Sequence, residues 1–126
     1  MNKIENISAV GRRKSAVARV ILTPGHGKIV CDYVFTKKSD TDEIMHLFDL
    51  LGLASKYNVK LFLTGGGYHS RIDATKLAVA RALVKLDESN KKTLREAGYI
   101  TRDPREKERK KPGLRRARRA PQWAKR

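Results

Sequence analysis

Basic side chains crowd the last eighteen residues of the chain. Residues 109–126, called the tail below, hold nine of the 29 lysines and arginines and no acid, so the tail supplies +9 of the formal charge of +16. A planar guanidinium binds phosphate through two parallel hydrogen bonds and stacks on bases, and an indole offers a further stacking face. The tail residues suited to this chemistry are Arg109, Lys110, Lys111, Arg115, Arg116, Arg118, Arg119 and Trp123. The tail is therefore predicted to bind a polyanion.

The tail has little to fold around. Its only large apolar side chains are Leu114 and Trp123, which cannot offset the roughly 1–2 kcal/mol per residue that ordering a backbone costs. Pro112, Gly113 and Pro121 prevent one continuous helix. We expect an extended thread, disordered in free solution, that fits irregular folded RNA better than the major groove of a duplex. The alternative is a solvated basic tail that aids solubility or targeting.

Other chemistry has weaker support. The segment Gly25-His26-Gly27-Lys28 resembles part of a phosphate loop, but Ile29 stands where that motif requires a hydroxyl and the first glycine is missing. A turn explains this segment better.

No metal or cofactor is expected either. The acids Asp40, Asp42 and Glu43 could suggest a metal site, but they suit a helix start, and the single Cys31 is expected to be a reduced strand thiol. The dispersed histidines are His26, His46 and His69, and no pair of nucleophile and base is apparent. We expect a protein that is not an enzyme.

Charge and length divide the chain in two. The first 108 residues carry the remaining 20 basic residues against 13 acids, so they are predicted to form a globular domain, residues 1–108, that also faces a polyanion. No apolar run approaches a membrane span, and residues 1–10 lack the pattern of a signal peptide. We expect a cytosolic protein, or one made where it works.

Three segments have strand character. The run 15–22 ends in β-branched residues suited to a buried strand, and it follows an expected break with three positive charges at Gly11-Arg12-Arg13-Lys14. The segment 23–27 has turn residues, so 28–31 is predicted to return as the second strand of a hairpin. Residues 59–64 form the third strand, which ends at three consecutive glycines.

Three segments have helix character. One is expected from a cap at Ser39 or Asp40 to about Ala54, and a short one from Asn90 to Ala97, ending at Gly98. The third is expected from Arg71 to Leu86, with Ser70 and Asp73 as a capping box. Its apolar side holds Ile72, Val79, Leu83 and Leu86, and its other side holds Arg71, Arg81 and Lys85, which either are solvated or face RNA.

These motifs, taken in order, resemble a known family. They are Gly11-Arg12-Arg13-Lys14-Ser15, Ala18-Arg19-Val20, Pro24-Gly25-His26-Gly27-Lys28-Ile29, the triple glycine, Ala80-Arg81-Ala82-Leu83, Thr101-Arg102-Asp103, Glu108-Arg109-Lys110-Lys111 and the terminal Lys125-Arg126. Each motif alone is weak, but the ordered set resembles the bacterial type of small-subunit ribosomal protein S-nine over nearly the whole chain.

The resemblance implies an α+β fold, a small two-layer α/β sandwich of the ribosomal S-five second-domain type with a left-handed βαβ crossover, where generic chirality rules predict a right-handed one. It implies a structural protein of the small-subunit head that binds small-subunit rRNA, works in the cytoplasm or in an organelle that encodes its own ribosomal proteins, and neighbours other head proteins. It also implies that the residues matching Lys125 and Arg126 approach tRNA in the peptidyl site. The candidate rRNA-binding residues before the tail are Arg12, Arg13, Lys14, Arg71, Arg81, Arg102, Arg105 and Lys107.

Two other functions fit the charge. A nucleic-acid packaging protein would coat duplex DNA about as well as structured RNA. A membrane-active cationic tail would need a bulky apolar face, which residues 109–126 lack.

Overall fold

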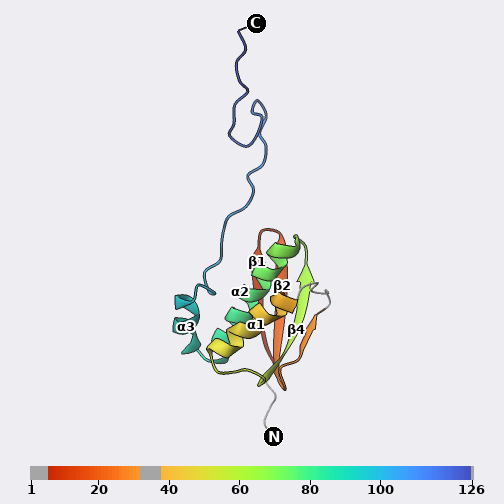
Figure 1. Ribbon diagram of the computed structural model, residues 1–126, viewed down its shortest axis with the longest axis vertical. Coiled ribbons are helices and arrows are strands. Elements are labelled where there is room, and N and C mark those ends of the chain that lie inside the picture. Colours follow the sequence, from red (N-terminus) through yellow and green to blue (C-terminus); the bar gives the residue numbers. More distant parts are fainter. Residues whose placement is uncertain (1–5, 32–37, 126) are drawn as a thin grey trace.

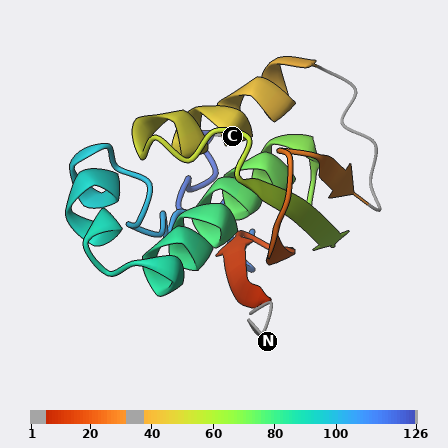
Figure 2. The same cartoon turned by 90° about the horizontal axis from the view of Figure 1, so that it is seen from below.

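The computed structural model describes residues 6–31 and 38–125. One four-stranded sheet carries helices on one of its faces (Figures 1 and 2). In chain order the elements are β1 (Ile7–Arg13), β2 (Ala16–Pro24), β3 (Ile29–Cys31), α1 (Lys38–Leu50), β4 (Tyr57–Thr64), α2 (Tyr68–Leu86) and α3 (Asn90–Glu96). This is the predicted α+β, two-layer class, and the unit β3–α1–β4 joins two parallel strands through a helix, as a βαβ crossover does.

The strand order is β1-β2-β4-β3, and it overturns the predicted hairpin. The strand at 29–31 does not return beside β2; it pairs in parallel with β4, which separates it from β2. Asn58 at the start of β4 explains the path, because its Oδ1 accepts hydrogen bonds of 3.0 Å from the backbone N–H groups of both His26 and Lys28. The segment 25–28 is thus fastened across the end of β4 instead of reversing along β2.

The hairpin of this fold lies earlier in the chain. β1 and β2 pair antiparallel, and the register from Ile7 opposite Leu22 to Arg13 opposite Ala16 leaves Lys14 and Ser15 as the turn. Lys14 takes the positive φ of 51° that such a turn requires. The expected break at residues 11–14 is therefore wrong, since the strand continues through Gly11 to Arg13.

Gly11 stays in the strand because α2 lies directly against it. A Cβ at Gly11 would stand 2.2 Å from the carbonyl oxygen of Ala74 and 2.4 Å from the amide nitrogen of Ala78. Alanines on the same side of α2 allow the backbones of helix and strand to approach each other. The helix buries ten residues, and Ile72, Val79 and Leu83 are among them, as predicted. Leu86 is partly buried and packs against the core.

The helix starts differ from those predicted. α1 begins at Lys38, so both predicted cap positions lie inside the helix, which ends at Leu50 rather than near Ala54. α2 begins at Tyr68 after Gly67, and no side chain caps it. The predicted capping box is wrong because Ser70 lies buried within the first turn. α3 ends before Gly98, whose φ of 82° suits the predicted position after the helix.

Candidate nucleic-acid interface

The tail stands apart from the folded part of the chain (Figure 1). Residues 104–125 contain no helix or strand, and the last side chains that pack on the core are those of Tyr99 and Ile100. Trp123 is 81% exposed. Arg126 lies outside the described residues. The exposed basic residues of the described tail are Arg109, Lys110, Arg115, Arg116, Arg118, Arg119 and Lys125.

Glu108, directly before the tail, forms ion pairs with two basic residues of the tail. Its carboxylate pairs with the Lys111 ammonium and, at 3.0 Å, with the Nε of Arg118. The backbone amide of Arg115 donates to the carbonyl of Arg119 at 2.8 Å, which closes a loop within this segment. These exposed pairs are weak in water, so a phosphate can displace them.

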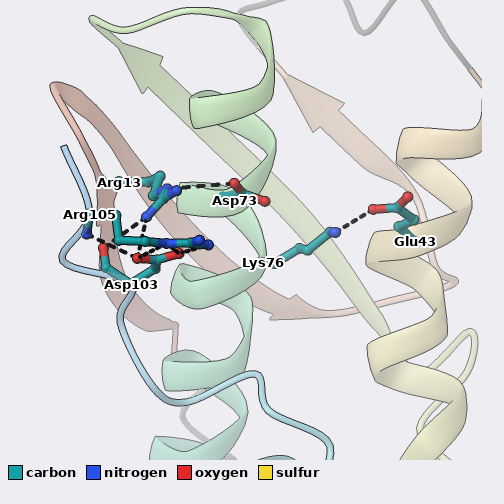
Figure 3. Close-up of polar contacts among 6 residues, drawn as sticks. All are labelled: Arg13, Glu43, Asp73, Lys76, Asp103 and Arg105. Atoms are coloured by element: carbon teal, nitrogen blue, oxygen red, sulfur yellow. Dashed lines mark hydrogen bonds and ion pairs between the residues drawn. The ribbon is translucent and has the colours of Figure 1, made fainter. Parts of the chain in front are cut away.

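Ion pairs of two arginines, Arg13 and Arg105, fix the start of the segment that leads to the tail (Figure 3). The guanidinium of Arg13, at the end of β1, lies between two carboxylates: Nη1 is 2.8 Å from Oδ1 of Asp103, and Nε is 3.7 Å from Oδ2 of Asp73 in α2. Nη1 also donates to the backbone carbonyl of Asp103 at 3.1 Å. The Arg13 side chain is only 13% exposed, so the structure engages it internally rather than presenting it to solvent.

Asp103 is held from the other side by Arg105. The Arg105 Nη2 lies 2.7 Å from Oδ2 of Asp103, and its Nε lies 3.0 Å from Oδ1. These side-chain bonds, with the Arg105 amide and then Arg13, hold the pKa of the Asp103 carboxyl well below its usual range, and Asp103 in turn raises the pKa of Arg105. Arg105 keeps 84% of its side chain exposed, so it can still meet a phosphate.

The cations around these ion pairs form a basic recess. A cavity of about 370 Å³ is lined by five cationic side chains and only two acidic ones. The cations are those of Arg12, Arg13, Lys76, Arg102 and Arg105. Four of these were predicted from the sequence, and the fold brings them together from β1 and from the segment after α3. Lys14 is exposed at the neighbouring turn, and Lys107 is exposed farther along the chain.

The basic side of α2 is not simply solvated. Arg81 donates from Nη1 to the carbonyl of Val10 at 2.8 Å, and Lys85 donates from Nζ to the carbonyl of Ser8 at 2.7 Å. Both carbonyls belong to β1, the edge strand. Arg71 lies near the other end of the helix, where its Nε donates to the carbonyl of Gly65 at 2.9 Å. These three side chains therefore stabilise the fold, and Arg81 and Lys85 remain exposed as well.

Two basic residues on the strands were not among the RNA-binding candidates predicted from the sequence. Arg19 in β2 and Lys60 in β4 are exposed on the sheet face opposite the helices, as is Arg12 in β1. The alternation of burial along each strand, with a period of two, is the signal that could have found them.

The alternative chemistries gain no support from the described residues. The amides of His26 and Lys28 already bond to Asn58, so the 25–28 segment does not offer them to a phosphate. Within residues 6–31 and 38–125 no group of three potential metal ligands comes together; Glu43 instead pairs with Lys76 of α2 at 2.5 Å (Figure 3). None of the helices in the described part of the chain is long and apolar enough to cross a membrane.

Comparisons with known proteins agree with the motifs. The family model described as ribosomal protein S9/S16 matches residues 11–126. The small ribosomal subunit protein uS9 of Thermosynechococcus vestitus is 47% identical over 122 residues, which cover 92% of this chain and 89% of that protein. The protein of the same name from Porphyromonas gingivalis is 44% identical over 128 residues, covering 98% of this chain and all (100%) of that protein. The one from Gemmatimonas aurantiaca is 47% identical over 128 residues, covering 97% and 98%. With a basic tail, a sheet covered on one face by helices, and similarity over nearly its whole length, this chain belongs to the ribosomal protein S9/S16 family.

Proposed function

We propose that this chain is a structural constituent of the head of the small ribosomal subunit and binds small-subunit rRNA. The observation that carries the proposal is the tail: seven of the cations in its described part are exposed, its sequence contains no acid, and its arginines can each bind phosphate with two hydrogen bonds. Its relatives are named small ribosomal subunit proteins. The chain acts as a binding component and not as an enzyme.

The proposal divides the work between two parts. Residues 1–108 form a folded domain whose basic recess contacts RNA through Arg12, Arg102 and Arg105, and residues 109–126 thread into folded RNA. For Arg13, which was predicted to bind rRNA, the proposed role is mainly structural. Because Asp73 and Asp103 surround it, it positions the chain that leads to the tail and contacts RNA little itself.

The finer part of the proposal concerns the tip. The tail extends away from the domain in Figure 1, and a tail end of this kind can reach a partner that the domain does not touch. By family resemblance, Lys125 and Arg126 approach tRNA in the peptidyl site.

RNA binding and its salt dependence test the rRNA proposal. Full-length protein should prefer a folded transcript of small-subunit rRNA over duplex DNA of equal length at the same salt concentration. Deleting residues 109–126 should flatten the log–log salt dependence by several units, since each phosphate neutralised contributes a slope of roughly −0.7 to −0.9. Equal affinity for RNA and DNA would instead favour nucleic-acid packaging, and an unchanged slope would exclude the tail as the main binding element.

A further inference from the structure

The sheet face opposite the helices is open within the described residues (Figure 2). Arg19 from β2 and Lys60 from β4 are exposed on it, and Arg12 from β1, which also lines the basic recess, is exposed at its edge. The strand positions on this face carry no acid. A face with this charge attracts anions and repels cationic partners.

The same face carries more apolar surface than water favours. Val10, Val30 and Phe62 are exposed by 39%, 46% and 37%, and Val17 and Ile21 are half-buried between them. A solvated sheet face normally alternates to polar residues. Here the outward positions of the central strand β2 are Val17, Arg19, Ile21 and Thr23, a mixture that suits partial burial by a partner.

The register places the aromatic ring among the cations. Arg19 lies directly opposite Val10 on one side and opposite Phe62 on the other. Lys60 lies opposite Ile21 and Val30, and its Nζ stands 5.4 Å from the centroid of the Phe62 ring. The outward positions of the four strands thus hold one aromatic ring, with Arg19 beside it on β2 and the Lys60 ammonium over it.

We propose that this open face is a second RNA-binding surface, which takes an unpaired RNA segment. One base stacks on Phe62, and the neighbouring phosphates bind Arg19 and Lys60. Stacking on an aromatic side chain works for any base and needs the base to be unpaired. The inference deepens the proposed rRNA binding by adding a surface distinct from the tail and by specifying single-stranded RNA.

Charge selects RNA over a protein as the occupant. A purely apolar face would suit a neighbouring protein, but the three cations of this face, with no acid beside them, would require an acidic partner surface. RNA supplies regularly spaced phosphates together with the flat apolar faces of its bases, and so it matches both features of the face.

Substitutions on the face separate stacking from charge. Binding of the full-length protein to unstructured polyuridine RNA, long enough to meet both tail and sheet, is measured over a range of salt concentrations. Phe62→Ala should weaken binding by about tenfold without changing the salt slope, because base stacking carries no counterion term. Phe62→Tyr keeps the ring and should bind like the unsubstituted protein. Arg19→Ala should weaken binding and flatten the slope by about 0.7, the value for one phosphate of a single strand.

Matched substitutions elsewhere provide the controls. Leu50→Ala removes an apolar side chain of similar exposure, 39%, from the end of α1, and Arg95→Ala removes an exposed cation from α3. Thermal unfolding of every variant confirms that it is folded. If the unsubstituted protein binds the folded rRNA transcript but not polyuridine, the open-face inference alone fails; if it binds neither RNA, the proposed function fails.

If it binds, and Phe62→Ala and Arg19→Ala behave like their controls, the open face is not an RNA surface. Unchanged RNA affinity combined with poor incorporation of these variants into small subunits would show that a protein covers the face, and this too would overturn the inference.

Discussion

Single residues at the end of β1 show how tightly the fold constrains its side chains. Gly11 is the point where strand and helix backbones nearly touch, and the limiting neighbours are backbone atoms of Ala74 and Ala78. Backbone atoms of a packed helix cannot move aside as a flexible side chain can. The next two residues differ in burial: Arg12 is exposed, whereas Arg13 lies against the carboxylates of Asp73 and Asp103.

Gly11→Ala tests this contact. We expect a loss of stability of about 1–3 kcal/mol, as for other overpacked sites, measured by urea unfolding. Gly67→Ala is the control, since a Cβ there meets nothing within 4 Å and the φ of −89° is allowed for alanine. Equal stability of the two variants would show that α2 shifts at no cost.

Asp103 provides a residue-scale prediction about pH. Its pKa is lowered in the folded protein, so its ionised form stabilises the fold; this contribution is complete above the ordinary carboxyl pKa of about 4 and is lost as the pH falls through the folded value. Arg105→Gln should raise the Asp103 midpoint in a carboxyl NMR titration, because the side chain of Arg105 is the main cause of the shift. The Asp87 midpoint serves as the internal reference, since its pKa is lowered mainly by the Ser89 amide. An Asp103 midpoint that does not move would rule out this pair as the cause.

At the scale of elements, α2 protects the edge of the sheet. An edge strand with unpaired carbonyls can pair with another copy of the chain, and Arg81 and Lys85 occupy two such carbonyls of β1. The two side chains are four positions apart on the helix, and the two carbonyls belong to residues two positions apart on the strand. Helix and strand run closely enough together for both bonds to form.

The double variant Arg81→Ala/Lys85→Ala should therefore increase self-association. Light scattering at raised salt, where net charge is screened, would measure it against protein concentration. The double variant Lys91→Ala/Lys92→Ala in α3 loses the same charge without touching β1, and it should remain monomeric. Equal scattering by the two variants would attribute the effect to charge alone.

At the scale of the molecule, deletions test the proposed separation of roles between the tail and the domain. Tyr99 and Ile100 are the last side chains that pack on the core, and the ion pair of Arg13 with Asp103 also lies before the tail. Deleting residues 109–126 should leave the thermal transition nearly unchanged, with a slight rise possible from reduced repulsion. Deleting residues 99–126 also removes the two packed side chains and the ion-pair partner of Arg13, so it should clearly lower the melting temperature. Loss of the transition in the shorter deletion would contradict the division of labour.

The last two residues of the tail can be tested separately from the rest of it. Lys125 and Arg126 are two of the nine basic residues of the tail, so deleting them changes the overall field little, and rRNA affinity and subunit assembly should survive. If the tip contacts tRNA, retention of peptidyl-site tRNA on isolated small subunits should weaken by about 1–3 kcal/mol, as expected for one or two charge-assisted hydrogen bonds. Dissociation rates are compared at equal occupancy of the two proteins on the subunits. Identical rates would leave the tail as an rRNA anchor only.

Features that depend on composition and local pattern could be predicted from the sequence. The unbalanced charge of the tail, the end of α2 at Leu86, the end of α3 before Gly98 and the strand at 59–64 all follow from charge counts, apolar spacing and glycine positions. These properties arise within a few neighbouring residues, so no distant contact is needed to settle them.

Tertiary structure alone decided which segments meet. Asn58, some 30 residues away, bonds to the 26–28 backbone and so directs β3 to β4, and Gly11 belongs to a strand that pairs with β2 and packs against α2. The partners of Arg13 come from α2 and from residue 103. Local patterns cannot reveal such pairs, because side-chain and backbone partners distant in sequence are brought together only when the whole core packs.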